Sequence, residues 1–197
     1  MINTYGIVVL AAGASVRLGK PKQLLEYEGK NLLQHVLDAA VNSDGEPVIV
    51  VLGANADLVA AEIDKSKVHV IKNSEWEQGM ASSLRMGLKT LQKISPSVEG
   101  VIFMVCDQPH VSPELINELI TAHIGSGKPI VTCNYGEAIG PPAFFHKSLF
   151  ADLMKLKGDA GARKVIQLHS DEVATVLFTK GKIDIDTKED YEALRNS

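Results

Sequence analysis

The chain of 197 residues is predicted to form one α/β domain, residues 1–197, in which helices cover both faces of a mostly parallel sheet. Short apolar runs such as Ile7–Leu10, Val48–Leu52 and Val98–Cys106 have the length and β-branched content of buried strands. Helical patterns alternate with these runs, which is typical of parallel βαβ units in three layers. A composition of 45% hydrophobic and 22% charged residues is that of a globular domain with one sizeable core.

The first half of the chain shows this alternation most clearly. Asn31 precedes an apolar stripe and is expected to cap a helix. The turn Asp44–Pro47 then leads into the second strand, which Gly53 closes. The expected elements of this half are a strand over 7–10, a helix over 32–41, a strand over 48–52, a helix over 55–63 and a strand over 68–71.

The second half continues the pattern with clear start signals. Gly79 opens a helix, Ser112 caps another with Pro113 at its first position, and Thr187 with Asp190 forms a capping box. Late short strands are expected to add an antiparallel piece to the sheet. The expected elements are a helix from 80, a strand over 98–106, a helix from 113, a strand over 129–133, helices near 149–154 and 163–168, a strand over 173–178 and a helix from 188.

Composition excludes several functional classes. A net charge of −4 with mixed charges and no basic block predicts no nucleic-acid partner. There is no apolar run long enough to span a bilayer and no signal-peptide pattern, so we expect no membrane partner and a cytoplasmic location. Cys106 and Cys133 lie in apolar runs without CxxC spacing, which favours buried free thiols over a disulfide or metal site.

The stretch Gly6–Leu25 carries the strongest functional signal. The first strand ends in small residues, Ala11–Ser15, which allow a ligand to approach the backbone and allow N–H groups to converge on an anion. The cations Arg17 and Lys22 follow, so the stretch suits a polyphosphate. The alternative is an ordinary turn between strand and helix with solvated cations.

Two common phosphate motifs are excluded. A Walker A loop has four residues between its glycines, but five separate Gly13 from Gly19, and Lys20 is followed by Pro21 instead of a hydroxyl residue. The dinucleotide fingerprint fails because Ser15 stands where its second glycine is required.

The whole string LAAGASVRLGKPKQLL resembles the signature loop of the MobA-like nucleotidyltransferase family. It is most similar to the molybdenum cofactor cytidylyltransferase (MocA-type) branch, with its LAAGxSxRxGxxK loop, whereas the guanylyltransferase branch typically has glycine in place of Ala12. Further strings resemble the branch in the same order: WEQGMASSLRMG, CDQPHVS, GPPAFF, GDAGAR and DIDTKEDY, the last with Lys188 where the branch usually has proline. The resemblance implies the three-layer, Rossmann-like fold of nucleotide-diphospho-sugar transferases.

The signature loop and the segment after Trp76 are the expected nucleotide site. Arg17 is expected to hold the β- and γ-phosphates and Lys22 the α-phosphate, which makes these two the catalytic residues. Trp76 could cover the nucleotide base, although a lone tryptophan more commonly packs in the core or at the rim of a site. The predicted nucleotide-binding residues are Leu10, Ala11, Ala12, Gly13, Ser15, Arg17, Lys22, Gly79, Met80 and Ser82 or Ser83.

Two aspartates are predicted to bind Mg²⁺. Asp107 follows the strand 98–106, and the carboxyl ends of parallel strands meet at the ligand crevice, where Mg²⁺ takes one or two carboxylates plus phosphate oxygens. The alternative for Asp107 is a turn or capping role. Asp184 and Asp186 alternate with isoleucines and would share one face of a strand. The resemblance assigns Asp186 as the second metal ligand.

The resemblance also implies an acceptor site. Gly140, Pro141 and Pro142 are expected in a ligand-sized loop, whose alternative is a hairpin connection. Asp159, Gly161 and Arg163 come from the GDAGAR string, where Asp159 is alternatively the cap of the next helix.

The implied reaction is transfer of CMP from CTP to the phosphate of molybdopterin carrying molybdenum, with release of pyrophosphate and transient contact with a molybdenum hydroxylase. Two alternatives stay open. One is a GTP- or sugar-phosphate-specific nucleotidyltransferase of the same fold, and the other is a non-catalytic carrier of the molybdenum cofactor.

Overall fold

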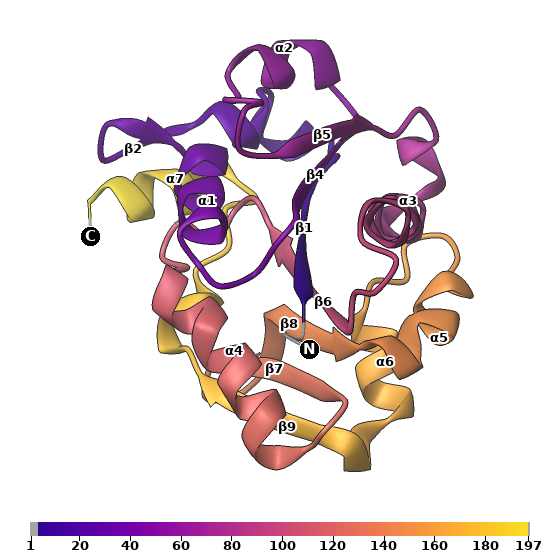
Figure 1. Ribbon diagram of the computed structural model, residues 1–197. Helices are drawn as coiled ribbons and strands as arrows, with labels where there is room; N and C mark the ends of the chain where they lie inside the picture. Colours follow the sequence, from indigo (N-terminus) through magenta and orange to yellow (C-terminus); the bar gives the residue numbers. More distant parts are fainter. Residues whose placement is uncertain (1–3, 197) are drawn as a thin grey trace.

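A seven-stranded sheet runs through the centre of the protein (Figure 1). The computed structural model describes residues 4–196. Six strands are parallel and only β8 runs against its neighbours, which confirms the predicted mostly parallel α/β class and its antiparallel piece. The strand order is β5 (His69–Lys72), β4 (Val48–Leu52), β1 (Tyr5–Ala11), β6 (Gly100–Val105), β8 (Ile139–His146), β7 (Ile130–Asn134) and β9 (Val173–Leu177).

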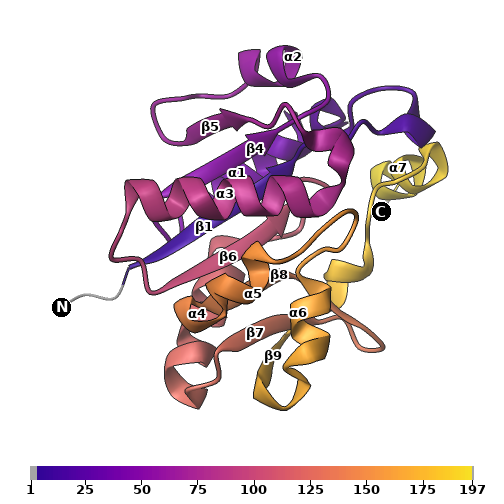
Figure 2. The ribbon, with the colours of Figure 1, turned by 90° about the vertical axis from the view of Figure 1, so that its right-hand side faces the viewer.

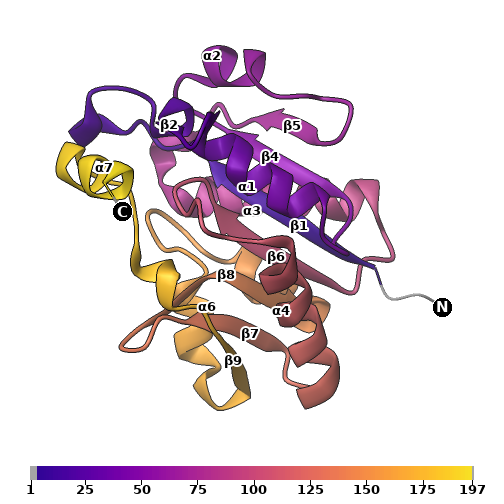
Figure 3. The same ribbon diagram turned by 90° about the vertical axis from the view of Figure 1, so that its left-hand side faces the viewer.

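Helices cover the sheet on both faces. Figure 2 shows α3, α5 and α6 on one face, and Figure 3 shows α1 and α4 on the other. The helices are α1 (Leu32–Val41), α2 (Ala56–Ala61), α3 (Met80–Ile94), α4 (Pro113–Ser126), α5 (Phe150–Met154), α6 (Arg163–Leu168) and α7 (Lys188–Arg195). In the part of the chain that the structure describes, no helix is long and apolar enough to cross a bilayer.

Strand β1 explains why the sheet needs two helical layers. Ile7 and Val9 pack into the cluster that includes α1 and α4, while Val8 packs into the cluster that includes α3. All three are fully buried, because successive side chains of a strand point to opposite faces. Helix α3 approaches closely through Gly87, where a Cβ atom would lie 2.4 Å from Val8.

The predicted helix starts are confirmed. The Asn31 side chain accepts from the Gln34 N–H at 2.7 Å at the start of α1. Ser112 caps α4 with Pro113 at its first position, and Thr187 forms a capping box with Asp190 at α7. Each cap satisfies a backbone N–H that has no partner within its own helix. Both cysteines are buried and free, as expected.

The segment expected to be a loop around Gly140 is instead part of β8, and this prediction was wrong. The register shows the reason: Thr132 faces Ala143, but the next residue of β7, Cys133, faces Gly140. Pro141 and Pro142 lie in the irregularity between these two pairs, where a proline without an N–H does not break the ladder. The hairpin alternative, β7 followed by β8, is therefore correct.

One further local expectation and one alternative were wrong. Residues 183–186 are irregular and do not form a strand. Asp159 does not cap the following helix, because Ala162 is the residue that precedes its first turn.

A small third cluster joins the signature loop to the end of the chain. It consists of Leu18, Leu25, Leu32, Ile185 and Leu194. The hairpin of β2 (Glu26–Tyr27) and β3 (Lys30–Asn31) lies beside α7, and the Tyr191 hydroxyl donates to the Glu26 carbonyl at 2.7 Å (Figure 3). Segments almost 170 residues apart in sequence, Arg17 and Asp186 among them, therefore lie side by side.

Candidate active site

A cavity of about 320 Å³ opens at the carboxyl ends of β1 and β6, and we call it the first chamber. This is the edge of the sheet at which open α/β folds bind their ligands. Its lining residues are Leu10, Ala12, Gly13, Lys22, Trp76, Gly79, Met80, Ser83, Val105, Cys106, Asp107 and Asp159.

The signature loop is held in place through its carbonyl groups. The Gln23 amide donates to the carbonyls of Ala11 and Gly13 at 2.8 and 3.1 Å. The Ala54 N–H donates to the Ala12 carbonyl at 3.0 Å. Because three successive carbonyls are bound by the protein, the loop is fixed before a ligand arrives, which is the preorganisation that anion binding by backbone N–H groups needs. Gln23 is fully buried, and nothing in its sequence context distinguished this role.

Ser15 brings Lys22 into the site. Its backbone has a φ of 54°, in the left-handed region, which turns the chain sharply after Ala14. The Lys22 N–H donates to the Ser15 hydroxyl at 3.0 Å, and the Leu18 N–H donates to the Ser15 carbonyl at 3.0 Å. Ser15 therefore closes the loop and does not line the first chamber.

Lys22 lies between two of the predicted carboxylates. Its ammonium group bonds to Asp107 and, at 2.9 Å, to Asp186. Burial disfavours the charged form of Lys22, but the two carboxylates outweigh it and hold the pKa of Lys22 above its ordinary value. The same ammonium holds the pKa of Asp186 below its usual range, assisted by Arg17 at 2.5 Å. The Arg17 side chain is two-thirds exposed.

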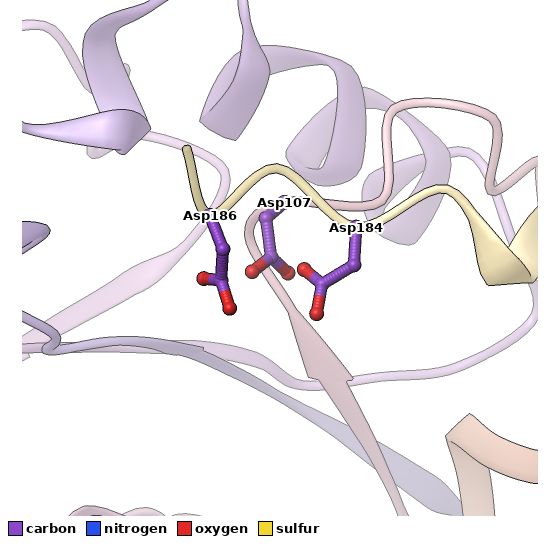
Figure 4. Close-up of side chains that lie close together, drawn as sticks. All are labelled: Asp107, Asp184 and Asp186. Carbon is purple, nitrogen blue, oxygen red and sulfur yellow. The ribbon is translucent and has the colours of Figure 1, made fainter. Parts of the chain in front are cut away.

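Asp184 joins this group as a third carboxylate (Figure 4). Oxygen atoms of Asp107, Asp184 and Asp186 all lie within 4.8 Å of one another. Asp184 keeps solvent access, yet partial burial and the neighbouring Asp107 raise the pKa of its carboxyl to about 7. The alternating IDID pattern predicts that Asp184 and Asp186 lie on one face of a strand. Their carboxylates do lie close together, although the backbone there is not a strand.

The acidic cluster fits a divalent cation. Asp107, Asp184 and Asp186, which we call the acidic cluster, face one ammonium group and the exposed guanidinium of Arg17, so negative charge is in excess, and together with burial this raises the pKa of Asp184. Within residues 4–196, Oδ1 of Asp107 is buried without a hydrogen-bond partner. Mg²⁺ and Mn²⁺ prefer such carboxylate oxygens.

The start of α3 forms the opposite wall. The Asn73 amide donates to the hydroxyls of Ser82 and Ser83 at 2.8 and 2.9 Å. Ser82 also donates to backbone carbonyls of the preceding turn, so it supports the wall from behind. Ser83, Gly79 and Met80 line the first chamber together with Trp76.

A second chamber, also about 320 Å³, adjoins the first and shares Leu10, Met80 and Val105 with it. Of the predicted acceptor residues, Gly140, Pro141, Gly161 and Arg163 line it. Its other lining residues are Leu84, Phe103, Met104, Tyr135, Ala138, Ile139, Ala143, Ala162 and Ile166. The second chamber is therefore largely apolar, with one cation at its edge.

Asp159 and Pro142 lie elsewhere. Asp159 lines the first chamber, next to Gly79, where an added Cβ atom would lie 2.6 Å from the Asp159 carboxylate. Pro142 is buried within β8 and lines neither of the two chambers. Ala11 is likewise buried, at the end of β1.

A parallel sheet with a preformed loop after β1, a lysine and an acidic cluster defines the nucleotidyltransferases of the nucleotide-diphospho-sugar transferase fold. The sequence model of the MobA-like NTP transferase domain matches residues 7–173 of the chain. The protein belongs to this family.

Relatives extend over the whole chain. The "Purine catabolism protein PucB" of Bacillus subtilis is 29% identical over 96% of this chain and 95% of its own. The crystal structure of Rv0371c from Mycobacterium tuberculosis H37Rv is 34% identical and covers all of both chains, with a TM-score of 0.85. A structure of Rv0371C in complex with manganese is 30% identical over 99% of this chain and all of the other, with a TM-score of 0.82.

Proposed function

We propose that the protein transfers CMP from CTP to the phosphate of molybdenum-loaded molybdopterin, giving molybdopterin cytosine dinucleotide and pyrophosphate. The observation that carries the transfer reaction is the meeting of Lys22 with Asp107, both at the wall of the first chamber, and with Asp186. Such a reaction is an in-line displacement at the α-phosphorus, which depends on positioning and on stabilisation of charge.

The signature loop and its two cations supply that stabilisation. Backbone N–H groups of Ala12 and Gly13 would bind the β- and γ-phosphates together with Arg17. Lys22 would move from its carboxylate partners to the α-phosphate. Both cations are now paired with Asp186, so nucleotide binding exchanges carboxylate partners for phosphate oxygens.

Asp107, Asp184 and Asp186 would hold the divalent cation, for which Mg²⁺ is our proposal. When bound, the cation neutralises the triphosphate and orients it toward the attacking group. The manganese complex of the Mycobacterium tuberculosis relative supports a divalent metal in this family.

No protein base or nucleophile is needed, because the attacking phosphate is already ionised at neutral pH. Cys106 lines the first chamber, but burial raises the pKa of its thiol to about 12 and keeps it protonated. A covalent route through this thiol is therefore disfavoured.

The two chambers would divide the substrates between them. The nucleotide lies in the first chamber, with its base against Gly79, Ser83 and Trp76. The acceptor enters the second chamber, where Arg163 at the start of α6 would bind its phosphate. CTP and molybdopterin are proposed on the resemblance of the signature loop, with Ala12, and of the GPPAFF and GDAGAR strings to the cytidylyltransferase branch.

The test is pyrophosphate release from CTP, GTP, ATP and UTP with Mg²⁺, with and without molybdenum-loaded molybdopterin. We expect release only with CTP and the acceptor together, and its loss when EDTA removes the metal. Release with GTP would mean that the reaction is as proposed but that the base is guanine. Release with a sugar phosphate, tested as a second acceptor, would mean that molybdopterin is not the acceptor. Tight binding of the cofactor without release from any nucleotide would contradict an enzyme and favour a carrier.

A further inference from the structure

The acidic cluster depends on a segment without regular structure. Asp184 and Asp186 lie in residues 183–186, which are neither helix nor strand, whereas Asp107 follows directly on strand β6. Ile185, fully buried in the third cluster, anchors this segment toward the signature loop. The Lys22 ammonium bonds to both Asp107 and Asp186, but it would leave them when nucleotide binds, so a contact on the side of β6 is needed to hold the segment at its distance from Asp107.

Gln108 makes that contact. It follows Asp107 in the chain, is 5% exposed, and donates through its amide to the Gly181 carbonyl at 3.0 Å. Gly181 lies three residues before Asp184. One side-chain hydrogen bond therefore joins the neighbour of the first carboxylate to the segment that carries the other two.

Tyr135 completes the connection. Gln108 also donates to the Tyr135 hydroxyl at 3.0 Å, and this hydroxyl donates to the Pro141 carbonyl of β8. Burial raises the pKa of Tyr135 above its ordinary value, so the hydroxyl keeps its proton and remains a donor at neutral pH.

The packing around Tyr135 leaves little room for movement. A Cβ atom on Gly181 would lie 2.2 Å from the Tyr135 ring, and one on Gly140 would lie 2.7 Å from the hydroxyl oxygen. Both glycines allow the ring to lie directly against the backbone. The segment leading to Asp184 is therefore held against the sheet by close contact as well as by hydrogen bonds.

We propose that Gln108 and Tyr135 are positioning residues that set the separation of Asp107 from Asp184 and Asp186, and thereby the affinity for the divalent cation. Neither residue lines the first chamber, where we place the nucleotide, and Gln108 lines neither chamber, whereas the Tyr135 ring lines the second. Residues that hydrogen-bond behind the ligands of a metal hold the ligand atoms in place, and we assign this role to Gln108 and Tyr135. The inference rests on the proposed function only in requiring that the acidic cluster binds a metal.

The test is Mn²⁺ binding to the full chain without nucleotide, measured by isothermal titration calorimetry. Gln108→Leu removes both hydrogen bonds while keeping a side chain of similar size. We expect it to weaken Mn²⁺ binding by a factor of about 10 to 100, the usual effect of losing a residue that supports metal ligands. Tyr135→Phe keeps the ring and loses only the hydroxyl, so we expect a smaller loss, about threefold.

Thr132→Val is the matched control. The Thr132 hydroxyl donates to the Gly140 carbonyl at 2.7 Å, in the same hairpin as Tyr135, but it does not reach the C-terminal segment. This variant also loses one buried hydrogen bond, so its melting temperature should fall about as much as that of Tyr135→Phe, while its Mn²⁺ affinity should equal that of the wild type.

The outcomes separate this proposal from the proposed function. Unchanged Mn²⁺ affinity in Gln108→Leu and Tyr135→Phe, with lowered melting temperatures as in Thr132→Val, would show that the two residues only pack the fold, and would overturn the proposal. If the wild type and Asp107→Asn bind Mn²⁺ equally, the metal assignment itself fails and the positioning role falls with it. Rescue supplies a second readout: excess Mn²⁺ should restore turnover in Tyr135→Phe.

Discussion

The two chambers have the same size and share a wall, yet they differ in almost everything else. The first is lined by Lys22 and Asp107, which belong to the charged cluster with Asp184 and Asp186, whereas the second is mostly aliphatic and aromatic, with Arg163 at its edge. Burying charge is costly unless it is paired, and the buried Asp107 is paired with Lys22 at the first chamber. The difference supports our proposal of a division of labour, in which the first chamber performs the chemistry and the second selects the acceptor.

The largest effect is expected from Asp107→Asn. The change removes a buried charge from the acidic cluster while keeping its shape, so the metal loses a ligand and metal-dependent pyrophosphate release should fall to background. Pyrophosphate release at several Mg²⁺ concentrations checks this. Asp57→Asn, which changes an exposed carboxylate on α2 paired with Lys72 at 3.1 Å, is the control and should be fully active. Full activity of Asp107→Asn would contradict the assignment of Asp107 as a metal ligand.

Lys22→Ala should follow, with turnover lowered by about two to four powers of ten, the scale of one lost charge contact in the transition state. The matched control is Lys20→Ala. Lys20 belongs to the same loop, but its ammonium lies over the Tyr191 ring, 5.2 Å from the centroid, outside the first chamber. Single-turnover rates of the two variants make the comparison. Equal rates would mean that Lys22 serves only to neutralise Asp107 and Asp186.

A smaller and different effect is expected in the second chamber. Ala162→Leu places a larger side chain in that chamber, and we expect the KM for the acceptor to rise about tenfold, or ~1.4 kcal/mol, with the KM for the nucleotide unchanged. Ala151→Leu, at an exposed position on α5, is the control. A rise in the nucleotide KM instead would show that the chambers do not divide the substrates.

The smallest effect concerns stability in the absence of metal. The folded-state pKa of Asp184 is raised to about 7 from an ordinary 3.8, so the folded protein loses stability as pH rises from about 4 to 7 and this carboxyl ionises. With EDTA present, Asp184→Asn should melt about 2 °C higher than the wild type at pH 8, and the two should converge near pH 4. Thermal melts across this range check the sign. A lower melting temperature for the variant at pH 8 would mean that the ionised Asp184 is already stabilised without metal.

Much of the fold was predictable because it depends on local signals. Buried strands, caps and the alternation of strands with helices act over a few residues, and Asp107 could be placed because it follows the strand 98–106 directly. The position of β8 was not predictable in this way. Two prolines argue against a strand in the middle of a sheet, and only the register with β7 shows that they occupy an irregularity.

The supporting residues of the site were harder to predict for the same reason. Gln23 holds carbonyls 10 and 12 residues away, and Gln108 bonds to Gly181, 73 residues away. Such contacts have no periodic or motif signal in a single sequence. Ser82 illustrates the converse. The resemblance of the WEQGMASSLRMG string made Ser82 or Ser83 a candidate for nucleotide binding, but the Ser82 hydroxyl is occupied by Asn73 and backbone carbonyls.

The most direct test of the division between the chambers is a crystal structure with Mn²⁺ and a non-hydrolysable CTP analogue, in which anomalous scattering locates the metal. We predict Mn²⁺ on the carboxylates of Asp107, Asp184 and Asp186, the triphosphate against Ala12 and Gly13, and the second chamber left open for the acceptor. A metal bound away from Asp107, or a nucleotide lying in the second chamber, would contradict the account.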